Sequence, residues 1–269
     1  MPEMILSRRN RIIKNAVQLS GSAEYRRECG LYFLEGARLC ADAASSSVSI
    51  RTLFYTEAAA EKYGNYLSLA RNNAQEIYVV GPQAAQSLSR TKTPQGIFCI
   101  CEMSANVLKG SELTERGAYL ALENLQDPAN LGAILRTAEA MGITGVLLGG
   151  NCCDLYSPKV LRASMGAVFR QRIFLEEDLP RLFSALNQRG FITAAAVPDR
   201  GALPVTKMDF SIPCVLAVGN EGNGLTQETQ KSCSAQITIP MLGRAESLNA
   251  SAAAAILIWE MMRNRAGAS

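Results

Sequence analysis

The stretch IPCVLAVGNEGNGL, residues 212–225, joins an apolar run to a loop that has three glycines within six residues. A short apolar run that ends at such a loop predicts a buried β-strand followed by a tight turn. Glycine permits positive φ angles and lets a ligand approach the main chain closely. A turn shaped only by folding explains the same glycines, so this stretch leaves open what comes so close to its backbone.

The loop differs from the dinucleotide fingerprint G-x-G-x-x-G, because its glycines follow the order G-x-x-G-x-G. It also contains Glu221. A carboxylate repels phosphate, so this position favours a cationic ligand or the orientation of an arginine.

Apolar strands alternate with helical stretches on both sides of this segment. In the first half, we expect strands at 31–36, 51–56, 76–80 and 96–101 and helices at 37–44, 61–72 and 82–89. In the second half, we expect strands at 118–125, 144–150, 190–197, 212–219 and 235–240 and helices at 131–141, 158–168, 179–188, 225–232 and 248–262. The pattern predicts an α/β protein: a small domain at 1–103, a polar linker at 104–116, and a second domain at 117–269 with a mostly parallel sheet.

The composition narrows the class of protein further. With 48% hydrophobic and 19% charged residues, the chain is typical of an ordered globular protein. Its longest apolar run, 252–259, is far shorter than the ~20 residues of a membrane span, and the start of the sequence lacks a long apolar signal region. We therefore expect a cytoplasmic protein without a membrane partner.

Histidine is absent, and the eight cysteines form no C-x-x-C pair. The missing histidine excludes a Ser-His-Asp triad, a Cys-His pair and an H-E-x-x-H zinc site within the chain. We expect no metal site. Any chemistry must use arginine, lysine, carboxylates, hydroxyls, amides and the backbone.

Positive charge gathers near the start of the chain. Residues 1–110 contain 13 Lys and Arg against 9 Asp and Glu, and the segments RRNRIIK (8–14) and YRR (25–27) are locally dense. Such density suits a polyanion, although a solvated helix face has the same composition. The candidate RNA-binding residues are Arg8, Arg9, Arg11, Arg26 and Arg27.

Two further segments lie where strands lead into helices, the usual place for ligands in such sheets. In NLQDPANLGAILRTAEAMGI (124–143), Asn130 is either a helix cap or a polar contact of the site, and Arg136 suits an anion clamp. In ITIPMLGRAESLNASAAAAILIWEMM (237–262), Ser247 is either an N-cap or a site residue, and the small residues at 250–255 allow close packing of another helix or subunit.

Together, the three segments resemble the three motifs of the SpoU/TrmH-type RNA methyltransferases of the SPOUT superfamily. The matching residues stand in the family's order within NLQDPANLGAILRTA, GNEGNGL and IPMLGRAESLNAS. The segment NRIIKNAVQLS…YRRECGLYFLEGARL is similar to that family's ribosomal-protein-like substrate-binding domain. One departure is Ala250, where many relatives have Val; it affects no catalytic position.

The resemblance implies a C-terminal domain with a deep trefoil knot, a homodimer formed through that domain, and bound S-adenosylmethionine (AdoMet). The cofactor-binding positions that it implies are Gly219, Asn220, Ile239, Met241 and Leu248. The implied reaction is methylation of a ribose 2′-hydroxyl in structured RNA, most simply ribosomal RNA. The catalytic positions are Asn130, Arg136, Glu221, Ser247 and Asn249, with Arg136 as a clamp because guanidinium stays protonated.

Three alternatives remain open at this point. The substrate could be transfer RNA; the same loops could bind a nucleotide or a small acid; and the protein could bind RNA as an assembly factor without turnover.

Overall fold

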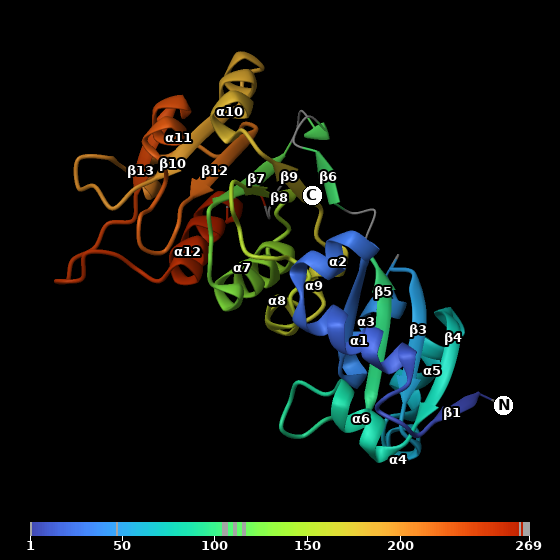
Figure 1. The fold of residues 1–269 in the computed structure, drawn as a ribbon. Helices are drawn as coiled ribbons and strands as arrows, with labels where there is room; N and C mark the ends of the chain where they lie inside the picture. Colours follow the sequence, from blue (N-terminus) through green and yellow to red (C-terminus); the bar gives the residue numbers. More distant parts are fainter. Residues whose placement is uncertain are drawn as a thin grey trace. The chain divides into compact units, whose positions relative to one another are not determined.

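The structure is a computed structural model that describes residues 2–46, 48–103, 107–109, 112–114, 117–263 and 265. It divides into two compact units. The first contains Met1–Ala105 and Asp154–Phe169, and the second contains Asn106–Cys153 and Arg170–Ser269 (Figure 1).

The first unit has a five-stranded mixed sheet in the order β1-β4-β3-β5-β2, in which β5 runs antiparallel to both of its neighbours. Its strands are β1 (Glu3–Ile5), β2 (Leu31–Glu35), β3 (Ile50–Tyr55), β4 (Ala74–Val80) and β5 (Ile97–Glu102). Its helices are α1 (Arg11–Gly21), α2 (Ala23–Cys29), α3 (Ala37–Ala44), α4 (Glu57–Lys62), α5 (Gly64–Asn73), α6 (Pro82–Leu88), α8 (Pro158–Ser164) and α9 (Ala167–Arg170), whose last residue is the first of the second unit.

Both faces of this sheet are covered, which explains why its strands are apolar at successive positions. Side chains of α1 and α6 form one core with Phe33, Phe54 and Phe98, while α3 packs against β2 and β5 and α5 packs against β3 and β4. Successive residues of a strand point to opposite faces, so Tyr32 and Leu34 are buried on the side away from Phe33.

The second unit has an eight-stranded sheet in the order β11-β13-β10-β12-β7-β8-β9-β6, and every pair in it is parallel. Its strands are β6 (Val107–Lys109), β7 (Ala118–Glu123), β8 (Gly145–Gly149), β9 (Ile173–Glu176), β10 (Ile192–Ala196), β11 (Leu203–Pro204), β12 (Cys214–Val218) and β13 (Ala235–Thr238). The expected α/β class with a parallel second sheet is confirmed.

Helices cover this sheet on both sides (Figure 1). They are α7 (Pro128–Ala140), α10 (Leu179–Gln188), α11 (Gln227–Ser232) and α12 (Ala250–Met262), with a short 3-10 helix at Val205–Lys207. Helix α10 packs against α11 over a core that includes Tyr119, Phe174 and Phe183, whereas α7 packs against α12. No helix in the described part of the chain has the length and hydropathy of a membrane span.

The structure differs from the expected linker at 104–116. Val107–Lys109 form β6, which pairs with β9, and Leu113 is buried in the core of the second unit. A strand of three residues at a sheet edge is too short for a periodic pattern, which is why the segment resembled a linker. Residues 104–106, 110–111 and 115–116 lie outside the described residues, so the domain boundaries remain a prediction.

Asp154–Phe169 also differs from expectation, because this segment lies within the range predicted for the second domain but belongs to the first compact unit. The helix expected at 158–168 is two helices, α8 and α9, separated by Met165 and Gly166, which both have positive φ. Tyr156 stacks on Tyr32 at a ring separation of 4.5 Å, and α8 packs against β2.

Candidate active site

A cavity of ≈ 540 Å³ opens in the second unit beyond the carboxyl ends of β10, β12 and β13. This is where loops of a parallel sheet meet and ligands bind. Its lining comes from four parts of the chain: 196–199, 218–225 with Gln230, 237–241, and 246–257.

The glycine loop after β12 folds back on itself. The backbone N–H groups of Asn220 and Gly224 each donate to the other residue's carbonyl at 3.0 Å. A Cβ atom on Gly219 would lie 2.0 Å from the carbonyl carbon of Gly224 and 2.2 Å from the nitrogen of Leu225, and Gly224 has φ of 66°. These two glycines are therefore required by the closure of the loop itself, whatever ligand its edge receives.

Glu221 fixes this loop to the turn before α7. Its carboxylate accepts hydrogen bonds from the backbone N–H groups of Gln126 (3.1 Å) and Asp127 (2.9 Å) and from the amide of Asn130 (3.1 Å). Burial raises the pKa of Glu221, but the hydrogen bonds, led by that of Asn130, outweigh it and hold the pKa below its ordinary value of 4.5. Glu221 is consequently an anion at neutral pH.

Asn130 and Asn249 extend this contact to the third segment. The amide of Asn249 donates to Oδ1 of Asn130 at 3.0 Å, so a continuous chain of hydrogen bonds joins Glu221, Asn130 and Asn249, which are distant in sequence. The buried Asn130 is not the cap of α7, because Asp127 caps it by accepting from the N–H of Ala129. Asn249, rather than Ser247, caps α12 by accepting from the N–H groups of Ser251 and Ala252.

Two residues that fix the glycine loop were not among the predicted site residues: Glu123, which sequence reasoning missed, and Asn124, which begins the first matching motif but was given no role. Asn124 has a positive φ of 54°, and its carbonyl accepts from the amide of Asn220 at 2.8 Å. The buried carboxylate of Glu123 accepts from the N–H (2.7 Å) and hydroxyl (3.0 Å) of Thr226. Together they hold both ends of the glycine loop, and a carboxylate in the last position of an apolar strand was the signal that could have found Glu123.

The structure brings most of the predicted site residues together around the cavity. The lining includes all five of the predicted cofactor positions, Gly219, Asn220, Ile239, Met241 and Leu248, and two of the predicted catalytic positions, Glu221 and Ser247. Arg136 is apart from them: it lies about two turns into α7, is exposed, does not line the cavity, and has no ion pair or side-chain hydrogen bond among the described residues.

The charge of the cavity limits what it can bind. Among the described residues that line it, Asp199, Glu221 and Glu246 are acidic, and none is Lys or Arg. Carboxylates without a compensating cation disfavour phosphate and favour a ligand that carries positive charge. Cys152, which lies close by and donates to the carbonyl oxygens of Leu122 and Gly149, is a protonated thiol at neutral pH because burial raises its pKa.

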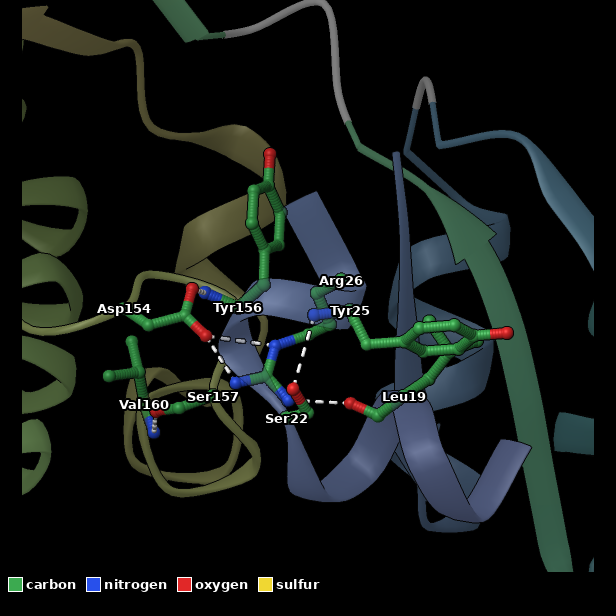
Figure 2. Close-up of polar contacts among 8 residues, drawn as sticks. All are labelled: Leu19, Ser22, Tyr25, Arg26, Asp154, Tyr156, Ser157 and Val160. Atoms are coloured by element: carbon green, nitrogen blue, oxygen red, sulfur yellow. Dashed lines mark hydrogen bonds and ion pairs between the residues drawn. The ribbon is translucent and has the colours of Figure 1, made fainter. Parts of the chain in front are cut away.

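The predicted RNA-binding arginines divide into two groups. Arg8, Arg9, Arg11 and Arg27 are exposed on the first unit. Arg26 is only 4% exposed, and its guanidinium forms an ion pair with Asp154 and donates to the carbonyl of Leu19 (Figure 2). The assignment of Arg26 to RNA binding is therefore corrected: with α2 in this position, its side chain points inward while that of Arg27 stays in solvent.

Two family models match the chain. The SpoU rRNA Methylase family matches residues 117–259, and the MRM3-like substrate binding domain matches residues 10–99.

Individual proteins resemble the chain over nearly its full length. An uncharacterized tRNA/rRNA methyltransferase of Synechocystis is 31% identical over 98% of this chain and 95% of its own. The 23S rRNA (guanosine(2553)-2′-O)-methyltransferase RlmP of Bacillus subtilis is 27% identical over 96% of this chain and 99% of its own. The crystal structure of an AdoMet-bound rRNA methyltransferase from Sinorhizobium meliloti superimposes with a TM-score of 0.86 at 29% identity, covering 97% of this chain and 98% of that one.

Proposed function

The chain belongs to the SpoU rRNA methylase family, and from this premise we propose that it transfers the methyl group of AdoMet to a ribose 2′-hydroxyl of ribosomal RNA. Its similarity to RlmP, a 23S rRNA 2′-O-methyltransferase, extends over nearly the whole of both chains. The match of residues 10–99 to a substrate-binding domain supports an RNA contact in the first unit.

The observation that carries the proposal is the cavity between the glycine loop and the segment before α12. It presents backbone and mostly apolar side chains from 218–225, 237–241 and 246–257, with three carboxylates and no Lys or Arg among its described lining residues. That surface fits the uncharged adenosine and the positive sulfonium of AdoMet, and it disfavours the nucleotide phosphates or the small acid of the alternative enzyme class. We assign Gly219, Asn220, Ile239, Met241 and Leu248 to holding AdoMet.

When bound, AdoMet supplies an electrophilic methyl group on a sulfonium. The protein must then place the ribose hydroxyl in line with that methyl group and let its proton leave. In our proposal, Glu221 keeps the glycine loop rigid by accepting from the N–H groups of Gln126 and Asp127. Asn130, which is hydrogen-bonded to Glu221, also holds the side chain of Asn249 in place. Ser247, on the cavity wall, donates to the ribose.

Arg136 has the role of an anion clamp in this proposal. It has no ion pair among the described residues, so its guanidinium is available to a backbone phosphate of the RNA. Guanidinium does not deprotonate, which excludes it as the base. The hydroxyl proton therefore leaves to a phosphate oxygen or to water.

The RNA surface that we propose on the first unit consists of Arg8, Arg9, Arg11 and Arg27, all exposed. Contacts between arginines and phosphates position the RNA, and they make the affinity for RNA fall steeply as the salt concentration rises. Ribosomal RNA as the substrate also makes the protein cytoplasmic in this proposal.

A homodimer through α12 completes the proposal. This helix is apolar around most of its circumference, yet Ala252, Ile256 and Trp259 form an exposed stripe, with Trp259 53% exposed. An apolar helix face of this kind is typical of a subunit interface. We further propose that the chain is knotted here, because after β13 it returns past the glycine loop to pack α12 against α7.

The decisive experiment measures transfer of labelled methyl from AdoMet to total RNA, followed by digestion to nucleosides. The protein is compared with Arg136→Ala and with Arg181→Ala, a matched control at an exposed arginine of α10 in the same unit. We expect label on a 2′-O-methylated nucleoside of ribosomal RNA, a loss of at least about 100-fold in Arg136→Ala, and normal activity in Arg181→Ala.

Binding data separate the alternatives. AdoMet affinity should be unchanged in Arg136→Ala, because Arg136 does not line the cavity. RNA retention without methyl transfer would favour an assembly factor, and label confined to transfer RNA would favour the other substrate. Absence of AdoMet binding would overturn the proposal.

A further inference from the structure

The three carboxylates of the cavity differ in what they are free to do. Glu221 is held by two hydrogen bonds from the turn before α7 and by one from Asn130 in its first turn. Among the described residues, the side-chain carboxylate of Asp199 accepts one hydrogen bond, from the N–H of Gly201, and that of Glu246 accepts none. Both are exposed, and neither has an ion pair among the described residues. Their charges therefore remain available to a ligand.

Nearby cations do not cancel these charges at the cavity wall. Arg200 and Arg244 stand one and two positions away in sequence, but neither lines the cavity or pairs with a carboxylate among the described residues. Asp199 follows β10, whereas Glu246 precedes α12. Two separate segments thus contribute negative charge to one cavity.

Charge is also what distinguishes the cofactor from its product. In methyl transfer the bond from carbon to sulfur breaks, its electron pair stays on sulfur, and a bond from the methyl carbon to the ribose oxygen forms as the hydroxyl proton leaves. The positive sulfonium becomes a neutral thioether, so the bound molecule loses one unit of charge while its shape hardly changes. Apolar contacts and backbone hydrogen bonds are then nearly equal for the two ligands, and charged side chains are the means of telling them apart.

We propose that Asp199 and Glu246 are specificity-determining residues that favour AdoMet over its neutral product, S-adenosylhomocysteine. This inference rests on the proposed function. Screened attraction between solvent-facing charges corresponds to a factor on the order of threefold in affinity for each carboxylate, and about tenfold for both. The product then leaves more readily than the cofactor.

Equilibrium binding on the full-length protein tests this. Dissociation constants are measured for AdoMet, for S-adenosylhomocysteine, and for sinefungin, which keeps a positive charge on an amine in place of the sulfonium. The variants are Asp199→Asn, Glu246→Gln and the double variant. Glu177→Gln is the matched control, because this exposed carboxylate of the second unit does not line the cavity.

The expected result is a fall of about threefold in the preference for AdoMet over the product in each single variant and about tenfold in the double variant. Sinefungin should weaken together with AdoMet, while the affinity for the product stays constant and thereby reports an intact cavity. High salt should reduce the preference of the natural protein in the same direction. The preference should be unaltered in Glu177→Gln.

An unchanged preference in the double variant, with both ligands still bound, would overturn the assignment of these two carboxylates and leave the proposed function standing. Equal weakening of all three ligands would also overturn it, since that pattern reports damage to the cavity rather than loss of charge selection. If the natural protein binds neither AdoMet nor the product, the proposed function fails, and this inference fails with it.

Discussion

Asp154→Ala should destabilise the first unit by removing the partner of a buried arginine. Asp154 accepts from Nε of Arg26 at 2.8 Å and pairs with its Nη2 (Figure 2). The Arg26 side chain is 4% exposed and that of Asp154 is 25% exposed. Without the carboxylate, Arg26 must stay charged in a place that water scarcely reaches, because guanidinium does not lose its proton.

The magnitude follows from this burial. Breaking a fully buried pair costs about 3–5 kcal/mol. Here the partly exposed Asp154 site admits some water, and Arg26 keeps its hydrogen bond to the carbonyl of Leu19. We therefore expect a loss of about 2–3 kcal/mol, equivalent to roughly 30- to 150-fold in an opening equilibrium.

Native-state hydrogen exchange read by mass spectrometry measures this locally. Peptides over α2 and α8 should exchange faster by that factor, while peptides over β7 and β12 in the second unit keep their rates. Asp154→Asn is the matched control, since it keeps the shape and an acceptor and should lose less. The double variant Arg26→Met/Asp154→Leu should recover much of the stability, because apolar side chains replace a buried pair well.

An acceleration below about threefold in Asp154→Ala would refute this reasoning, since it corresponds to less than about 0.7 kcal/mol. Hydrogen exchange and an RNA-binding titration of Arg26→Met together separate the two roles considered for Arg26. If Arg26 bound RNA, as its sequence context predicts, Arg26→Met would reduce RNA affinity and its salt slope without changing exchange in α2 or α8.

Three further predictions concern the second unit. Gly219→Ala should lower AdoMet affinity by at least about tenfold in a binding titration, because the added Cβ would collide with the backbone of Gly224 and Leu225. The control is Gly222→Ala, which should bind AdoMet normally, because its added Cβ would lie 3.6 Å from the nearest atom. The hydrogen bonds of Glu221 stabilise the folded loop at neutral pH, and this contribution should be lost as the pH falls below 4.5, because the pKa of Glu221 is lowered in the folded protein. We expect AdoMet affinity to be constant from pH 7 to 5 and to fall below that. An affinity that stays constant down to pH 3 would contradict this prediction. Trp259→Glu should convert the proposed dimer to monomers in light scattering, because a charge on the exposed stripe of α12 would have to be buried, and a monomeric natural protein would contradict the proposed interface.

The longer elements of the fold could be predicted from local pattern. The apolar runs around Leu120, Leu147 and Leu216 are strands because both faces of a parallel sheet are buried, which leaves a continuous signal. The strands missed are β1, β6, β9 and β11. Three of them, β1, β6 and β11, have two or three residues and lie at sheet edges, and β9 has four residues and pairs on one side with the three-residue β6. At such a length, pairing with a neighbour decides the conformation, and that neighbour is not visible in the local sequence.

The candidate site, too, could be predicted only in part from the sequence. Motif order predicted that 124–136, 219–225 and 239–249 act together; residues of the second and third segments line one cavity, and Asn130 of the first is hydrogen-bonded to both, whereas Arg136 lies apart. Capping was harder to predict: Asp127 and Asn249 cap the helices for which Asn130 and Ser247 had been considered. Several side chains in each segment could cap, and only the path of the backbone selects one.

The sequence by itself determined the α/β class, the three motifs and the absence of any histidine chemistry, because each depends on residue identity or on periodicity over a few residues. Tertiary structure alone decided that Arg26 points inward to Asp154, 128 positions away, and that Asp154–Phe169 joins the first unit. It also decided that Gly219 makes room for the backbone of its own loop. These features depend on which distant surfaces meet, and that is settled by the packing of the whole chain rather than by any local pattern.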